Sequence, residues 1–296
     1  MEIRLYKPDD YNSVIELCKF IWEGNDYLPH VINDYYQSPH CKPYVLIEDN
    51  KVVSVANANF FTKDFVWFQS IRTHPDYRSK GLGTKLSNFM MEEVKKVNGK
   101  EIWLSTSSNN EATAKMLSKQ GFTNPFNFSL WHFDYEESDK ETISQNKGLF
   151  DGSLVDLTYL QNHITDEVIN LANYWKIVET KDELKELDKK DFFLFSEFII
   201  CPADSYFIED WIINKCIFKN KKTGTIAVIS ESKEHDNVVT LGVSKSSEND
   251  ILSILYYTTQ HLSLDNKILK LFYHNDDDLP ILPNPRVFKI MKKKLT

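Results

Sequence analysis

The sequence is organised around one stretch, Arg78-Ser79-Lys80-Gly81-Leu82-Gly83. It lies between an apolar segment typical of a strand, residues 65–73, and an amphipathic pattern that predicts a helix over residues 84–96. Glycines let a backbone approach an anion closely, and the N–H groups at a helix start are unpaired and electropositive. Because two basic side chains lie beside the two glycines, the stretch predicts a loop that holds phosphate groups.

Two other phosphate-binding motifs do not fit this stretch. The dinucleotide loop needs three glycines, and the nucleoside-triphosphate loop ends in Lys followed by Ser or Thr, whereas here Thr84 precedes Lys85. Taken alone, two glycines among basic residues also suit an ordinary surface loop, so the context of the stretch has to decide.

Composition narrows the class of protein. The 296 residues are 42% hydrophobic, enough for one large domain or two modest ones. The formal net charge of -8 disfavours a nucleic-acid binder, which would usually carry a basic surface. The run Lys292-Lys293-Lys294 is interpreted as a solvated edge.

Cysteine spacing predicts reduced thiols, and hydropathy bears on the cellular compartment. The four cysteines form no C-x-x-C pair, so we expect neither a metal site nor a disulfide framework. The N-terminus has no signal-like apolar core, and no apolar run is long enough to span a bilayer. We therefore expect a cytoplasmic protein that does not associate with a membrane.

The first half of the chain predicts an α/β domain of the α+β type, in which helices pack on a mixed sheet. Asp9 and Asp10 are expected to cap the first helix, which runs to about Trp22. Gly121 is a good residue for the end of the helix that precedes it. The expected strands are residues 2–6, 44–48, 52–61, 65–73, 102–105 and 126–135, and the expected helices are residues 11–22, 30–37, 84–96 and 110–120.

This order of elements, the R-x-x-G-x-G pattern of residues 78–83 and a second motif together resemble the GNAT superfamily of N-acetyltransferases. Residues 110–122, NEATAKMLSKQGF, are similar to the family's N-x-x-A-x-x-L-Y-x-x-x-G-F. Thr113 and Met116 replace Ala and Leu of that motif, and Leu117 stands where many members have Tyr. Because this Tyr commonly protonates the departing thiolate, the resemblance implies another proton donor in this chain, or none.

The resemblance implies that acetyl-CoA binds where residues 65–73 and 102–105 splay apart. The backbone of Ile71, Arg72 and Thr73 would pair with the pantetheine arm, and Asn110 would reach the cofactor across the gap. The pyrophosphate would be held by Arg78, Ser79, Lys80, Gly81, Leu82, Gly83 and Thr84. The amine would attack the thioester directly, through a tetrahedral intermediate stabilised by a main-chain N–H.

The attacking amine must first lose a proton, and the strand before the loop offers Gln69 and Ser70 rather than a carboxylate. Asp26 can hold the ammonium group or relay its proton, and Tyr27 can donate to the thiolate. The alternative is that Asp26 shapes a turn and Tyr27 packs. His132 and Tyr135 are weaker candidates for catalysis, and His74 is expected to contact a phosphate or cap a turn.

A narrower resemblance concerns the acceptor. Residues 21–29, IWEGNDYLP, together with residues 70–75 and the long C-terminal half, are similar to the histidine N-acetyltransferase-like group. This implies transfer to the α-amine of a free amino acid such as L-histidine, although Gln69 stands where that group has Glu. The protein is expected to be a monomer or homodimer. Three alternatives stay open: a protein or peptide N-acetyltransferase, a non-catalytic acyl-CoA sensor, and an interaction protein with a structural loop.

The second half is predicted as a separate domain, residues 148–296, which follows a GNAT domain at residues 1–138 and a charged linker. Expected strands are residues 192–200, 216–219, 225–230, 238–243 and 268–273, with a helix at residues 249–262. The strand–helix–strand order repeats that of the first half, but the joining residues 244–248 contain no glycine. The half is therefore interpreted as a degenerate GNAT-like domain without a phosphate loop, with an unrelated α+β domain as the alternative.

Overall fold

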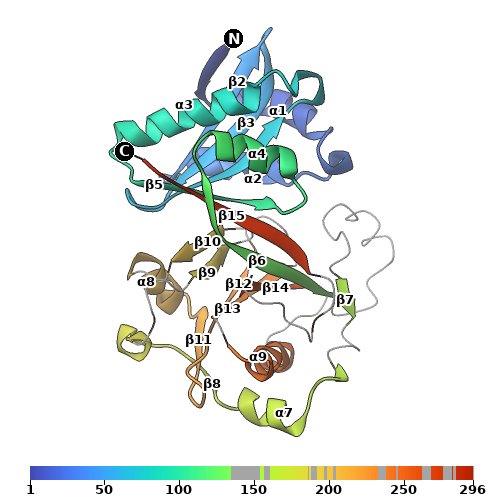
Figure 1. The fold of residues 1–296 in the computed structure, drawn as a ribbon, viewed down its shortest axis with the longest axis vertical. Helices are drawn as coiled ribbons and strands as arrows, with labels where there is room; N and C mark the ends of the chain where they lie inside the picture. Colours follow the sequence, from blue (N-terminus) through green and yellow to red (C-terminus); the bar gives the residue numbers. More distant parts are fainter. Residues whose placement is uncertain are drawn as a thin grey trace. The chain divides into compact units, whose positions relative to one another are not determined.

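The structure is a computed structural model that describes residues 1–134, 154–156, 161–185, 187, 192–196, 199–202, 205–232, 238–244, 246–261, 268–275, 282 and 285–295. The chain divides into two compact units, one made of Met1–Pro125 with Lys289–Thr296 and the other of Phe126–Phe288. Two strands, β6 (Thr123–Asp134) and β15 (Arg286–Lys294), each begin in one unit and end in the other. The C-terminal residues therefore belong to the first unit, as the red strand of Figure 1 shows beside β5.

The first unit contains a mixed sheet with the strand order β1-β2-β3-β4-β5-β15. Neighbours from β1 to β4 are antiparallel, whereas β4 and β5 are parallel because α3 connects them as a crossover. The predicted mixed α/β fold is confirmed. The strand bounds are β1 Glu2–Leu5, β2 Cys41–Glu48, β3 Lys51–Phe60, β4 Val66–Thr73 and β5 Glu101–Ser107.

Helices cover both faces of this sheet (Figure 1). Alternate side chains of a strand point to opposite faces, so Val45 packs in a cluster with α1 and α2, while Tyr44 and Leu46 pack in a second cluster with α3 and α4. The helices are α1 Tyr11–Cys18, α2 Leu28–Gln37, α3 Leu82–Lys96 and α4 Glu111–Lys119, with 3-10 turns at Pro8–Asp10, Trp22–Gly24 and Pro75–Tyr77.

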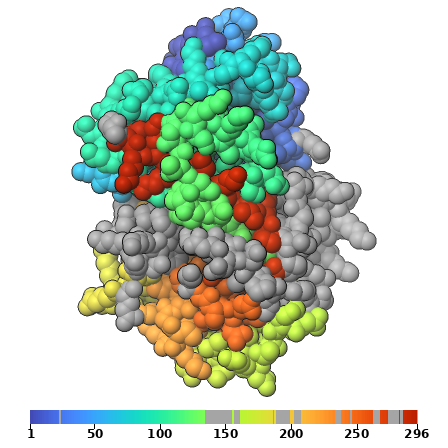
Figure 2. All heavy atoms as spheres, viewed as in Figure 1, coloured from blue at the N-terminus to red at the C-terminus, as the bar shows by residue number. Residues whose placement is uncertain are grey.

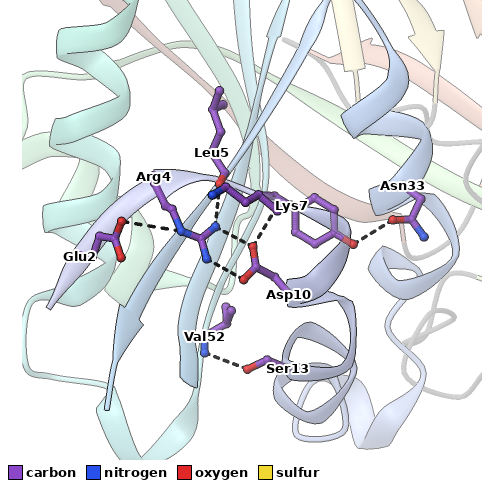
Figure 3. Close-up of polar contacts among 9 residues, drawn as sticks. Glu2, Arg4, Leu5, Lys7, Asp10, Ser13, Asn33 and Val52 are labelled. Carbon is purple, nitrogen blue, oxygen red and sulfur yellow. Dashed lines mark hydrogen bonds and ion pairs between the residues drawn. The ribbon is translucent and has the colours of Figure 1, made fainter. Parts of the chain in front are cut away.

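Asp10 fixes the entry into α1, although it does so differently from the predicted cap. Its carboxylate makes no cap hydrogen bond to the helix. Instead it accepts two hydrogen bonds from the Arg4 guanidinium, at 2.7 and 2.8 Å, and one from the Lys7 N–H at 2.8 Å (Figure 3). The side chain thereby ties β1 to the turn that starts the helix.

In the second unit the strand order is β6-β14-β13-β12-β11-β8 with β7 beside β6, and β9 and β10 form a separate hairpin. Its core packs apolar residues of α9, such as Leu255, against sheet residues such as Trp131 and Leu241. The bounds are β7 Leu154–Asp156, α7 Asp166–Ala172, β8 Trp175–Ile177, β9 Phe192–Ser196, β10 Ile199–Pro202, α8 Ser205–Ile213, β11 Ile217–Asn220, β12 Ile226–Glu231, β13 Val238–Val243, α9 Glu248–His261 and β14 Ile268–Asn275, with a 3-10 turn at Lys181–Leu184.

Three sequence predictions about elements were wrong. The first helix ends at Cys18 rather than near Trp22, because Trp22 has a positive φ of 46° and starts a 3-10 turn. The predicted strand 192–200 is two antiparallel strands. The lysine run is not a solvated edge, since Lys292 lies in β15, pairs with Glu101 at 2.8 Å and covers the ring of Trp103.

Two further points concern the chain as a whole. The predicted linker after Asp134 and the candidate Tyr135 lie outside the described residues. Among the helices that the structure does describe, none has the length and apolar character needed to cross a bilayer.

Candidate functional site

The parallel strands β4 and β5 diverge soon after they pair. Their registered pairs are Val66 with Ile102 and Trp67 with Trp103, and the register goes no further along β4. Residues 68–73 therefore keep β3 as a neighbour on one side, while their other edge has no registered pairing with β5. An open strand edge offers backbone N–H and C=O groups that a linear ligand can pair with.

The predicted phosphate loop lies at the end of β4 and leads into α3. Gly81 occupies the N-cap of α3 in the left-handed region, with φ of 75°, and no side chain caps this helix start. Ser79 is also left-handed, with φ of 60°, and Leu82 is buried in the core beneath. The first N–H groups of a 15-residue helix thus point out of an exposed loop, the arrangement that favours an anion.

Close packing explains the second glycine of the loop. A Cβ atom at Gly83 would lie 3.4 Å from Thr73 Oγ1, so a larger side chain would press on β4. The Thr73 carbonyl accepts a hydrogen bond from Arg78 Nε at 3.3 Å, and Lys80 Nζ lies 4.6 Å from the centre of the Tyr77 ring. The basic side chains therefore lie beside the helix start, and the loop residues fit the pyrophosphate group of a CoA ester.

His74 caps the turn before the loop, one of its two expected roles. Its Nδ1 accepts a hydrogen bond from the Asp76 N–H at 3.3 Å. Its ring also meets Phe20 and Tyr77 edge-on. The imidazole thus shapes the entry to the loop.

The second motif forms α4 and its cap. Asn110 is the N-cap residue, and its side-chain oxygen accepts from the Thr113 N–H at 3.2 Å. Gly121 is left-handed, with φ of 83°, and ends the helix as predicted. Leu117, which replaces the Tyr of many relatives, is 0% exposed and packs in the core, so it supplies no proton donor.

A groove of about 740 Å³ runs between α3 and α4. Thr84, the last residue of the predicted phosphate loop, lies at its lining together with Lys115, Lys119 and Lys293. Figure 2 shows atoms of the C-terminal strand, in red, beside the green atoms of α4. The groove is therefore a positively charged extension of the loop.

Asp26 and Arg72 form a buried ion pair on the opposite face of the sheet. Arg72 Nε and Nη2 donate to the carboxylate at 2.8 and 3.3 Å, and the Leu28 N–H donates to it at 3.1 Å. The Asp26 side chain is 0% exposed and that of Arg72 is 12% exposed. Burial by itself lowers the pKa of Arg72. The neighbouring Tyr27 and Asp26 raise this pKa by more than burial lowers it, so the guanidinium stays charged.

Arg72 also orders the aromatic residues of the α1–α2 segment. Its guanidinium lies 4.4 Å from the ring centre of Trp22 and 5.5 Å from that of Tyr27. Trp22 holds a positive φ, a conformation that persists only where contacts enforce it. The Arg72 side chain therefore fixes the segment that carries both predicted catalytic residues.

Tyr27 meets β4 at an irregularity of the strand. Its hydroxyl lies 3.0 Å from Ser70 Oγ. The β3–β4 register shifts here, so that Ala56 faces both Ser70 and Ile71, and Ser70 has a positive φ of 56°. Such a bulge turns backbone groups out of the ladder and is common beside active sites.

The equivalent β-α-β crossover of the second unit is closed. Strands β13 and β14 pair without interruption from Val238–Ile268 to Val243–Tyr273. At the start of α9 the Asp250 carboxylate accepts from Thr223 Oγ1 at 2.7 Å and from Ser247 Oγ at 2.8 Å. This helix start is thus covered by the chain's own negative charge and leaves no splayed edge beside it.

The remaining candidates contribute less. His132 is buried in β6 within the second unit. Among the residues that the structure describes, no three His, Cys, Asp or Glu side chains gather closely enough to hold a metal ion. Sequence reasoning missed the Arg72 side chain, the Trp22 ring and the Ser70 bulge, because each depends on contacts between distant segments.

Comparisons with known proteins agree with this arrangement. The profile of the acetyltransferase (GNAT) family matches residues 11–122. No curated protein matches the sequence.

One solved structure supports the fold. The crystal structure of a proposed acetyltransferase from Thermoplasma acidophilum superposes with a TM-score of 0.62 over 100% of both chains, at 13% identity. An acetyltransferase from Streptococcus agalactiae (23% identity, TM-score 0.37) covers 42% of this chain and 83% of its own. The ribosomal-protein-S18-alanine N-acetyltransferase of Escherichia coli (18% identity, TM-score 0.37) covers 47% of this chain and 85% of its own. The match to the acetyltransferase (GNAT) family model therefore lies within the first unit, over residues 11–122.

Proposed function

We propose that the chain is an acetyl-CoA-dependent N-acetyltransferase of the cytoplasm that acts on a small primary amine, the α-amine of a free amino acid such as L-histidine. The observation that carries this proposal is the divergence of β4 from β5 above the uncapped start of α3. Acetyl-CoA supplies an activated acetyl group on a thioester. The chain's own residues bind it, orient it and exclude water.

The cofactor side of the site is assigned to β4, the loop and α4. The backbone of Ile71 and Thr73 pairs with the pantetheine arm, and residues 78–84 hold the pyrophosphate with the N–H groups of α3. The lysines of the α3–α4 groove hold the end of the molecule that carries the third phosphate, since Thr84 of the phosphate loop also lines this groove. Asn110, whose oxygen caps α4, donates to the cofactor through its amide nitrogen.

The acceptor side is assigned to the α1–α2 segment. A main-chain N–H at the β4 bulge polarises the reacting carbonyl, which is worth several kcal/mol when the donor is preorganised, about 3–4 in measured cases. Tyr27 donates a proton to the departing sulfur, and Ser70 orients its hydroxyl. The proton that the attacking nitrogen loses restores the Tyr27 hydroxyl, so the transfer leaves an amide and a free thiol. Asp26 acts from its buried ion pair, by holding Arg72 and the segment in place.

Thiol release from acetyl-CoA, followed with a thiol-reactive dye, tests the proposal. The panel contains the twenty free amino acids, polyamines, aromatic amines and short peptides. We expect one strong response among the amino acids, with histidine first. A response from peptides alone would instead establish a peptide N-acetyltransferase.

A second candidate function is a non-catalytic acyl-CoA-binding module. The buried Leu117 in place of the family Tyr, and an Asp26 carboxylate that is fully paired, favour it. Tight CoA binding with no thiol release on any amine of the panel would establish this alternative and overturn the proposed transfer.

A further inference from the structure

Asn57, in the middle of β3, has a buried carboxamide that makes no hydrogen bond. The residue is 1% exposed, and neither its oxygen nor its nitrogen has a partner. Buried polar groups in native proteins are almost always paired, because an unpaired group loses its hydration without compensation. A carboxamide with both halves unpaired therefore points to a ligand or a water molecule that completes it.

The position of Asn57 places it on the acceptor side of the sheet. Its neighbours Ala56 and Ala58 face the α3–α4 cluster and Val55 faces the α1–α2 cluster, so the alternation of the strand points Asn57 toward α1 and α2. Its cross-strand partner is Gln69, which precedes the bulge at Ser70. The same face of β4 carries the contacts to Asp26 and Tyr27.

The charges on this face compensate each other. Arg72 is paired with Asp26, so the groups that can bind an acceptor there are neutral: the carboxamides of Asn57 and Gln69, and the hydroxyl groups of Tyr27 and Ser70. Gln69 is the partly exposed member of the cross-strand pair, and an acceptor that displaces its side chain reaches Asn57. Neutral amide groups can hydrogen-bond to a polar group next to the reactive amine of an acceptor. They provide no negative charge to bind an acceptor with a polycationic tail.

We propose that Asn57 recognises the acceptor through the carbonyl group next to its reactive amine, an inference that rests on the proposed function. Nδ2 donates to that carbonyl oxygen, and Oδ1 accepts an N–H from the amine, whose lone pair stays free for attack. The acceptor class is then an α-aminoacyl group, in which one carbon atom carries both the amine and the carbonyl group. A free amino acid and the first residue of a peptide both present such a group.

The test compares Asn57→Leu with Asn59→Leu, a matched change two residues along the same face. Asn59 is buried as well, but its oxygen accepts from Cys41 Sγ. The acceptors are L-histidine, the dipeptide histidylglycine and histamine, which lacks the carbonyl group; another amino acid and its matching dipeptide and amine replace them if the panel responds to it. The measurements are kcat/KM, the CoA dissociation constant and the thermal midpoint with and without each acceptor.

We expect Asn57→Leu to lower kcat/KM for the two carbonyl-bearing acceptors by roughly 10- to 100-fold and to leave that for histamine within about threefold. The CoA dissociation constant stays unchanged, and the thermal midpoint is unchanged or higher, because an unpaired polar group has been removed from the interior. Asn59→Leu keeps the wild-type preference for the carbonyl group. Whichever of amino acid and dipeptide reacts faster identifies the source of the aminoacyl group.

Two results would overturn the inference while leaving the proposed function intact: an equal effect on all three acceptors, or a lower midpoint for Asn57→Leu, which would assign the carboxamide to an internal water. If wild-type protein releases no thiol with any amine, the proposed function fails. In that case the inference is tested by the thermal midpoint of the CoA-bound proteins. It stands if carbonyl-bearing amines raise the thermal midpoint of wild type but not that of Asn57→Leu, and it fails without that difference.

Discussion

The buried negative charge of Asp26 is neutralised by Arg72, and the positive charge of Arg72 is neutralised by Asp26. Replacing Asp26 with Asn leaves a buried guanidinium without its counter-charge, so we expect the free energy of unfolding to fall by about 3–5 kcal/mol. Turnover should fall much more than CoA affinity, because the pair holds the α1–α2 segment and not the phosphate loop. Urea unfolding, steady-state kinetics and CoA titration measure the three quantities.

The double variant Asp26→Asn/Arg72→Met separates the two possible roles of Asp26. Removing both charges should recover most of the lost stability, since no unpaired charge is left. Turnover that recovers with stability assigns Asp26 to positioning, and turnover that stays low assigns it to proton transfer. Unchanged turnover in the single variant would remove Asp26 from the mechanism.

Tyr27→Phe tests the hydroxyl alone. The ring that faces Arg72 is kept, while the hydrogen bond to Ser70 Oγ is lost. If Tyr27 protonates the departing sulfur, kcat should fall roughly 100-fold with CoA affinity unchanged. The exposed Tyr36 provides the control, and Tyr36→Phe should behave as wild type. A Tyr27→Phe enzyme with kcat within about twofold of wild type would assign proton donation elsewhere.

At the scale of elements, Asp10 links β1 to α1, and the link depends on pH. Burial alone raises the pKa of Asp10, but hydrogen bonds from Arg4 and from the Lys7 N–H outweigh it and lower the pKa below its usual value. A lowered folded-state pKa stabilises the fold above the unfolded pKa of about 4, and this contribution disappears as the pH falls through the folded pKa.

We therefore expect Asp10→Asn to reduce the free energy of unfolding by about 1–3 kcal/mol at pH 7, and this difference from wild type to shrink as the pH falls through the folded pKa of Asp10. Urea unfolding of both proteins at neutral and at acid pH gives the comparison. A difference that is the same at both pH values would mean that Asp10 acts by shape and not by charge.

Elements with strong local patterns followed from the sequence. The crossover helix α3, the capped helix α4 and the strands around the 49–51 turn have apolar periodicity bounded by glycine or polar residues, and the structure confirms them. The end of α1 could not be predicted, because Trp22 is held by Arg72, fifty residues away. Helix α8 and strand β8 gave no clear period. Strand β15 was hidden by its lysine run, of which Lys292 pairs with Glu101 on β5.

The residues of the candidate site also fall into two groups, those in local motifs and those that depend on contacts between distant segments. The phosphate loop and the α4 cap are local motifs, so their residues could be named from the sequence. The Ser70 bulge, the ion pair of Arg72 and the unpaired carboxamide of Asn57 depend on the β3–β4 register, which a single sequence does not specify.

At the scale of the whole molecule, the chain returns to its first unit at its end. Met291 is buried in the core of that unit, Lys292 pairs with Glu101, and the Leu295 N–H donates to the Lys100 carbonyl at 2.8 Å. A chain that ends at Phe288 would leave β5 with an unpaired edge.

We expect this shortened chain to have a lower thermal midpoint and weaker CoA binding than the full chain. Lys292→Met in the full chain is the control that keeps β15 and removes the charge of Lys292, with its contacts to Glu101 and the Trp103 ring, and it should cost no more than about 1 kcal/mol. An unchanged midpoint and CoA affinity after truncation would show that the first unit is complete without β15.

The two crossovers suggest a division of labour between the units, since β4 and β5 splay while β13 and β14 stay paired. The central claim, one CoA site at the loop of residues 78–84, is tested most directly by calorimetric titration of CoA into wild type, Gly83→Asp and Gly83→Ala. Gly83→Ala adds only a methyl group 3.4 Å from Thr73 Oγ1 and should bind CoA within about tenfold of wild type. Gly83→Asp adds a negative charge to the first turn of α3 and a side chain that presses on Thr73, and it should abolish binding, whereas wild-type affinity in Gly83→Asp would contradict the account.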